Sequence, residues 1–377
     1  MQLIVLLGFI SLFADITYEG ARSILGPYLF VLGASSVFVG FIAGFGEFLG
    51  YFLRIFFGYL ADKLKNYWLF IFIGYFLNLL SVPLLAFANN YIFAGILILT
   101  ERIGKAIRTP SRDTIISYMG AKYGQGYAFG LHELIDQFGA FAGPTLIFII
   151  LFFSKINYKV AFLSLLIPAI ISILILIYVY QKFKYITIEN KKEAKFKSIW
   201  EEKKFWIYTI AISFVSFGFI DFALISYHYK KFNILSPEII AILYSVAMIV
   251  DAISSFILGK LFDKHGIRVI IFSIALTSFS SILLFIGKSK IFIILGIFLW
   301  GISIGSQESI MRAYISNIIK MEERATAFGI FNSIYGFSWF LGSFLLGYVY
   351  KISIILFVLI SFVFQILGLL VLTKFIK

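Results

Sequence analysis

The chain has 377 residues, of which 61% are apolar and only 14% charged, and its mean hydropathy is +0.99. Soluble globular chains carry roughly 25% charged residues, so the composition excludes a soluble domain and predicts an integral membrane protein. There is no cysteine and the three histidines are scattered, which excludes disulfides and thiolate chemistry and predicts neither a metal site nor a cofactor.

Twelve apolar runs follow one another along the chain, and a membrane-spanning helix needs about 20 such residues. The runs lie at about residues 3–30, 36–61, 67–88, 90–112, 126–153, 158–182, 205–230, 237–262, 268–287, 290–313, 324–350 and 352–375. The first run lacks a basic leader and a small-residue cleavage site, so we interpret it as a span and not as a signal peptide.

Basic residues concentrate in the connections between the runs, which explains the net charge of +13 by membrane topology and not by nucleic-acid binding. The connections expected on one side carry most lysines and arginines in the first half of the chain, so that side and both termini are predicted to be cytoplasmic. Residues 183–204 form a basic linker, which is either an amphipathic helix on the anionic inner leaflet or a solvated tether.

A ten-residue segment between apolar runs occurs twice, as GYLADKLKNY from residue 58 and GKLFDKHGIR from residue 259. The offset of 201 residues aligns Asp62 with Asp263. A glycine permits close helix approach, and an aspartate beside a basic turn caps a neighbouring helix or pairs with an arginine. The pattern resembles the loop between helices two and three of the major facilitator superfamily, which recurs between helices eight and nine. The first copy departs from it by having Lys65 and Asn66 in place of a glycine and a basic residue.

The resemblance implies an all-α integral membrane fold with twelve transmembrane helices in two pseudo-symmetric six-helix bundles, residues 1–182 and 205–377. A second echo, at an offset of 199, aligns residues 127–144 with residues 326–343 and supports the duplication. The residues to which we assign a gating or structural role are Gly58, Asp62, Lys63, Arg112, Gly259, Asp263, Lys264, Gly266, Arg268 and Arg312. Of these, both arginines at positions 112 and 312 are expected near span ends.

Many ionisable side chains fall within the predicted spans, where each costs about 2.5–3.5 kcal/mol if it is unpaired and faces lipid. Those assigned to a cavity or to proton coupling are Asp15, Glu19, Arg22, Glu101, Arg102, Lys105, His132, Glu133, Asp136, Asp221 and Glu308. At 100° per residue, the acids of the first span share one stripe, and so do Glu101, Lys105, Arg108 and Arg112 on the fourth. The two stripes are natural partners, and the resemblance places both on cavity-lining helices. For each group the alternative is a structural ion pair.

The fifth span contains Gly130, Gly139, Gly143 and Pro144. Their spacing resembles the antiporter motif of the drug:proton antiporter families, except that its final pair of glycines is absent. Glycines four residues apart also permit close helix packing, which is the alternative explanation. On the fourth span, Arg102 is similar to the membrane-embedded arginine of the same families.

We therefore predict a secondary transporter that is not an enzyme and that works by alternating access in the cell membrane of a prokaryote. The first choice is proton-coupled export of a small organic compound by a monomer. The alternatives are a carrier or flippase for an anionic substrate or lipid head group and, from another class, a non-transporting membrane receptor.

The proton carrier is predicted to be the acid whose basic partner can be exchanged for substrate or moved away during the cycle. Asp15 and Glu19 fit this requirement, with Arg102 or Lys105 as the displaceable partner. Asp136 is the next candidate.

Overall fold

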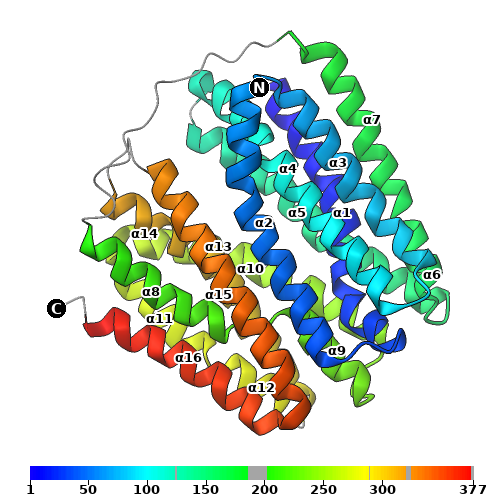
Figure 1. Cartoon of the computed structure of the whole chain (residues 1–377), viewed down its shortest axis with the longest axis vertical. Coiled ribbons are helices and arrows are strands. Elements are labelled where there is room, and N and C mark those ends of the chain that lie inside the picture. The colour runs from blue at the N-terminus through cyan, green and yellow to red at the C-terminus, as the bar shows by residue number, and fades with distance from the viewer. Residues whose placement is uncertain (124, 186–201, 288, 320–323, 375–377) are drawn as a thin grey trace. The chain divides into compact units, whose positions relative to one another are not determined.

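The computed structural model describes residues 1–123, 125–185, 202–287, 289–319 and 324–374. Within these residues the chain is helical and contains no strand (Figure 1). The helices of the first half are α1 (Gln2–Val31), α2 (Ser36–Leu64), α3 (Tyr67–Leu84), the 3₁₀ turn η1 (Leu85–Phe87), α4 (Tyr91–Tyr123), α5 (Gln125–Phe153), α6 (Tyr158–Ser164) and α7 (Leu166–Phe183). Those of the second half are α8 (Lys203–Gly218), α9 (Phe222–Lys231), α10 (Pro237–His265), α11 (Ile267–Thr277), α12 (Ser280–Phe285), α13 (Lys290–Glu308), α14 (Ile310–Ile318), α15 (Arg324–Ile352) and α16 (Ile354–Lys374).

Eleven helical segments among the described residues are long and apolar enough to cross a membrane. The remaining candidate, α4, is 33 residues long but carries too many charged side chains to qualify by apolarity. The all-α membrane fold is therefore confirmed, and most predicted span boundaries lie within a few residues of the observed ones. Most of the predicted linker, residues 186–201, and the C-terminal residues 375–377 lie outside the described part.

Contacts group the chain into two units, which we describe separately. Unit 1 comprises Met1–Ala34, Leu49–Lys191 and Tyr229–Ser245. Unit 2 comprises Ser35–Phe48, Lys192–His228 and Val246–Lys377. In unit 1, α1 packs mainly against α5, and α3 against α4; in unit 2, α8 packs against α15 and α16. The division of the chain at residues 182 and 205 stays a prediction.

Two spans that hydropathy predicts as continuous are interrupted in unit 2. The seventh breaks between α8 and α9, where Asp221 Oδ1 accepts a hydrogen bond from the Ala223 backbone N–H at 2.8 Å. The carbonyl groups released by the break are satisfied, since Trp300 Nε1 donates to Ile220 O at 2.8 Å and Ser361 Oγ to Gly218 O at 2.6 Å. Non-helical backbone at membrane depth requires such partners. The tenth span breaks at Ser309, between α13 and α14.

The two copies of the duplicated segment share a residue with a positive φ at the turn. Lys65 follows α2 with a φ of 52°, and Gly266, at the aligned position, follows α10 with a φ of 58°. Asn66 then caps α3, because its side chain accepts a hydrogen bond from the Leu69 backbone N–H. The lysine in the first copy therefore replaces the family glycine without removing the positive φ.

Candidate functional site

Helices α3 and α4 approach closely in unit 1, which positions the charged side chains of α4. A Cβ atom added to Gly74 would lie 2.6 Å from Arg108 Cβ, and one added to Gly104 would collide with the backbone N of Asn78. At this contact Asn78 Nδ2 donates to Glu101 Oε1 at 2.7 Å. Glycine is required on both helices here because any side chain would force them apart.

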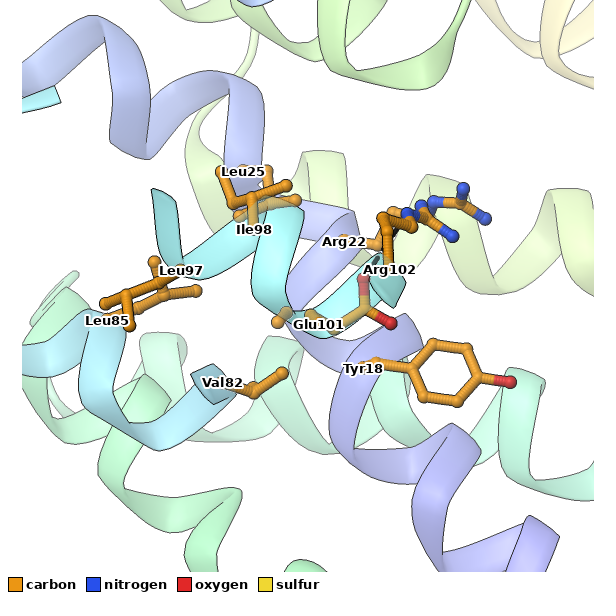
Figure 2. A pocket seen from close by; sticks show the side chains of 10 residues that line it. Tyr18, Arg22, Leu25, Val82, Leu85, Leu97, Ile98, Glu101 and Arg102 are labelled. Carbon is orange, nitrogen blue, oxygen red and sulfur yellow. Dashed lines mark ion pairs between the residues drawn. The ribbon is translucent and has the colours of Figure 1, made fainter. Parts of the chain in front are cut away.

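A pocket in unit 1 lies between α1, α3 with η1, and α4 (Figure 2). Its lining residues are Tyr18, Ala21, Arg22, Leu25, Val82, Leu85, Leu97, Ile98, Glu101 and Arg102, around about 280 Å³ of atom-free space that includes its open mouth. Figure 2 shows the leucine, isoleucine and valine side chains on one side and the charged groups with the Tyr18 phenol on the other. One wall of this pocket is therefore apolar, and the other carries charged and polar groups.

A chain of hydrogen bonds joins α1 to α4 through a tyrosine. Lys105 Nζ donates to the Tyr18 hydroxyl at 3.0 Å, and that hydroxyl donates to Asp15 Oδ1. Asp15 is buried. The predicted pairing of the acidic stripe with the basic stripe therefore runs from Asp15 to Lys105 through a neutral phenol.

The other buried acids of α1 and α4 have partners close by. Glu19 Oε1 lies 3.3 Å from Arg22 Nη1, and its Oε2 accepts a hydrogen bond from Tyr244, in the part of α10 that belongs to unit 1, at 2.6 Å. Glu101 Oε2 lies 3.3 Å from Arg102 Nε. Each of these acids pairs with a basic residue of its own helix.

Arg108 is the largest fully buried side chain in the described part of the chain, at 0% exposure. Its guanidinium carbon lies 4.3 Å from the Tyr75 ring centroid and 5.9 Å from that of Tyr18. Among the described residues, none accepts a hydrogen bond from its Nε, Nη1 or Nη2. Aromatic faces attract a cation but leave its N–H groups without acceptors. Arg108 lies inside the 33-residue helix α4, which continues past the predicted end of the fourth span at residue 112.

Arg112, which was expected near a span end with a gating or structural role, lies within α4 as well. Its Nη2 pairs with Asp113 Oδ1 at 2.9 Å, and its Nη1 donates to Ser11 Oγ on α1 at 3.0 Å. Ser11 Oγ also lies 3.2 Å from the Tyr75 hydroxyl and 3.0 Å from His132 Nε2. This serine thus links α1, α3, α4 and α5.

Helix α5 brings His132, Glu133 and Asp136 together, with potential ligand atoms within 4.8 Å of one another. His132 is buried, Glu133 is exposed and Glu133 accepts a hydrogen bond from Gln137. Asp136 Oδ1 is buried and has no hydrogen-bond partner among the described residues. Three cations of α4, at positions 105, 108 and 112, interact electrostatically with Asp136, which disfavours a further cation there. We assign no metal to this cluster.

The antiporter-like glycines of α5 pack mainly against α1. A Cβ on Gly139 would collide with Leu12 O, and one on Gly143 would lie 2.6 Å from Ile16 O, whereas Gly130 has nothing within 4 Å. Pro144 lies inside the helix. Close packing explains Gly139 and Gly143, and a specific antiporter role for the motif stays a prediction.

The duplicated segments lie at the ends of α2 and α10, where Asp62, Lys63, Asp263, Lys264 and Arg268 are exposed. Asp62 Oδ1 accepts a hydrogen bond from the Tyr67 hydroxyl at 2.8 Å. A Cβ on Gly58 would lie 3.4 Å from the Pro110 side chain, whereas Gly259 has nothing within 4 Å. A gating role for these residues stays a prediction.

Unit 2 holds the remaining predicted site residues. Asp221, unlike Asp15 of α1, does not lie within a continuous helix, because it caps α9. Glu308 is exposed at the end of α13, and Arg312 lies on α14, so the break at Ser309 separates two residues that were expected on one helix.

Sequence reasoning missed the neutral polar partners of the charged network, which are Ser11, Tyr18, Tyr75, Asn78 and Tyr244. The available signal was weak, since serine and tyrosine are common in membrane spans. For Tyr18, its position one helical turn after Asp15 was the usable indication.

Comparison with known proteins extends this picture. A family model described as the Major Facilitator Superfamily matches residues 6–343 and, in a second match, residues 224–376. An uncharacterized protein of Mycobacterium tuberculosis is 30% identical over 361 residues, covering 94% of this chain and 88% of the relative. An uncharacterized MFS-type transporter of Methanocaldococcus jannaschii is 30% identical over 363 residues, covering 92% and 88%.

Solved transporter structures share the fold at low sequence identity. The nucleoside transporter NupG aligns with a TM-score of 0.76 at 15% identity over 100% of this chain and 98% of that chain. A bacterial homologue of the human lysosomal transporter Spinster, inward-facing and unoccupied, aligns with a TM-score of 0.76 at 14% identity over 100% and 97%. The chain is a secondary transporter of the membrane, and it belongs to the major facilitator superfamily.

Proposed function

We propose that the protein couples the movement of a small organic solute to protons and that it exports the solute from the cell. The observation that carries the proposal is the chain from Asp15 through Tyr18 to Lys105, which joins a buried carboxylate to an ammonium group. Ionisable groups inside membrane helices usually mark a substrate path or a proton relay. A relay needs an acid that releases a proton when its basic partner approaches.

In this proposal Asp15 is the carrier and Lys105 its displaceable partner. A proton on Asp15 removes the charge that orders the Tyr18 hydroxyl, and Lys105 is then available to the solute or to another acid. Glu19 is the second acid of the same helix, and its bonds to Arg22 and Tyr244 make it less free to exchange partners. Asp136, which has a buried oxygen without a partner among the described residues, is the next candidate.

Export is the direction favoured by the glycine and proline spacing of α5. The basic connections favour cytoplasmic positions for Lys63 and Lys264 and for both termini. Because the chain has no cysteine, single cysteines introduced at these positions can be labelled from one side of the membrane only. Labelling of position 63 from outside would reverse the topology.

A screen in proteoliposomes tests the function. The purified protein is reconstituted, a pH gradient is imposed, and uptake of neutral, cationic and anionic organic compounds is measured together with the internal pH. Coupling predicts that a transported compound accumulates with the gradient and that its movement changes the internal pH. Equal uptake with and without the gradient for every transported compound would contradict proton coupling.

The second candidate is a carrier for an anionic substrate or a lipid head group. It is favoured by four basic side chains of α1 and α4, which are Arg22, Arg102, Lys105 and Arg108. Uptake of an anion or a lipid that does not depend on the pH gradient would favour this second candidate.

A further inference from the structure

The observation that no predicted role explains is the state of Arg108. Its side chain is completely buried, and no described residue accepts a hydrogen bond from any of its three guanidinium nitrogens. Lys105 and Arg112 lie on the same face of α4, about one turn away on either side. Arg112 has Asp113 as its partner and Lys105 has Tyr18, so Arg108 is the member of this stripe without an oxygen partner in the described structure.

A structural role does not account for this arrangement. A buried cation without acceptors is costly, and native structures satisfy buried N–H groups almost without exception. At the offsets of 199 and 201 residues that relate the two halves, Arg108 aligns with Gln307 and Ser309, and neither is a cation. There the buried polar side chain is Gln307, which is bonded to Tyr335 and to Ser303. The fold can therefore be built with neutral groups in this region, and the cation of unit 1 needs another explanation.

The chemistry of the missing partner follows from the shape of the donor group. A guanidinium presents parallel N–H groups that match the two oxygens of a carboxylate or a phosphate. Tyr18 connects Arg108 to the pocket, because the Tyr18 side chain lines that pocket and its ring lies beside both Arg108 and Lys105. An anion in the pocket would reach the two cations if this single ring moved aside.

We propose that Arg108 binds the carboxylate or phosphate group of the transported molecule, with Lys105 as the second cation and the apolar wall of the pocket holding the organic body. The proposal rests on the transport function and assigns its substrate class as an organic anion. Arg108 is then a determinant of specificity, whereas Asp15 carries the proton.

The test is the thermal melting of the purified full-length protein at constant ionic strength, with benzoate, phenyl phosphate, inorganic phosphate and benzylammonium as probes. Ligands that bind only the folded state raise its melting temperature. We expect a rise with benzoate or phenyl phosphate, a smaller rise with inorganic phosphate and none with benzylammonium. R108Q should weaken the apparent affinity for the anion by at least about tenfold, since two charge-assisted hydrogen bonds are lost. K351Q, which removes one exposed positive charge, is the matched control and should keep the full response.

The variant R108K keeps the positive charge and removes the paired N–H groups of the guanidinium, so it should retain part of the rise in melting temperature. It replaces R108Q in the test if R108Q does not fold. A second arm compares nanodiscs of phosphatidylcholine alone with nanodiscs that contain phosphatidylglycerol. A rise that depends on Arg108 and appears only with phosphatidylglycerol would identify a lipid head group as the source of the anion.

Two results overturn the inference: no rise with any anion in either arm, or a full response in both R108Q and R108K. The proposed function fails separately. If the anion binds through Arg108 but no compound moves with the pH gradient, proton coupling is wrong and the anion site stands. If a cation or neutral compound accumulates with the gradient while no anion binds, the transport function stands and the anion site is wrong.

Discussion

The fourth and tenth spans, which the duplication relates, solve the burial of polar groups in opposite ways. In α4, charged side chains recur on one face of the helix, at positions 101, 105, 108 and 112. In α13, residues 301–308 have serine, glycine and glutamine on the buried positions, and their one charged residue, Glu308, is exposed. The next charged residue of the tenth span, Arg312, lies beyond the break, on α14. Both segments are helical and largely buried. The second copy therefore has neutral side chains at the positions that align with Arg108, which supports the proposal that Arg108 acts in transport.

The largest change in stability is expected when a cation is placed in α13, at the position of Gln307. Gln307 is buried and bonded to Tyr335 and Ser303, so Gln307→Arg would bury a charge without a partner and should destabilise the protein by about 3–5 kcal/mol. Thermal melting and monodispersity in detergent measure this. The reverse change in unit 1, Arg108→Gln, removes a buried cation and should cost far less. Equal losses of stability in the two variants would contradict the proposed difference between α4 and α13.

A matched pair of tyrosines gives the next effect. Tyr18→Phe removes a hydroxyl bonded to a lysine and an aspartate and should cost about 1.5–3 kcal/mol, the range for bonds to charged groups. Tyr335→Phe removes a hydroxyl bonded to Gln307 and should cost about 0.5–1.5 kcal/mol. Only the first should lower proton-driven uptake in proteoliposomes. A loss of coupling in Tyr335→Phe alone would move the site to unit 2.

The close approach of α3 to α4 positions the charged side chains of α4. Gly74→Ala would press a methyl group onto the backbone and Cβ of Arg108, and such overpacking should cost about 1–3 kcal/mol. Gly130→Ala is the control, because nothing lies within 4 Å of the added atom and a helical glycine is replaced by a better helix former. Melting temperatures compare the two. An unchanged melting temperature for Gly74→Ala would show that α3 and α4 can separate at little cost.

The smallest effect concerns the turn after α2. Lys65 has a φ of 52°, which costs a residue with a Cβ about 1 kcal/mol relative to glycine. Lys65→Gly should therefore raise the unfolding free energy by up to about 1 kcal/mol and make the first turn equivalent to the one at Gly266. A lower melting temperature in this variant would mean that the lysine side chain has a stabilising role.

Most of the fold was predictable because the span length is fixed by the membrane. The second span, for example, was predicted at 36–61 and α2 covers Ser36–Leu64. Hydropathy did not predict where helices break or end, because tertiary contacts determine the backbone conformation there. The break before Asp221 depends on Trp300 and Ser361, which are distant in the sequence. The fourth span was predicted to end at residue 112, yet helix α4 continues to Tyr123.

The candidate site was predictable in its charges and not in its contacts. Helical periodicity placed Lys105 and Arg108 on one face, and the structure agrees. Periodicity could not show that Glu101 pairs with the adjacent Arg102, or that a tyrosine stands between Asp15 and Lys105. Such pairings depend on how closely two helices approach, and that distance is set by glycines such as Gly74 and Gly104.

The most direct test of the account is transport by the variants Asp15→Asn and Glu19→Gln, singly and together, in liposomes with an imposed pH gradient. The account predicts that Asp15→Asn abolishes accumulation of the substrate against its gradient while exchange of internal for external substrate continues, because exchange requires no net proton movement. Glu19→Gln alone should have the smaller effect. Full accumulation by the double variant would contradict the assignment of the proton to α1 and direct attention to Asp136.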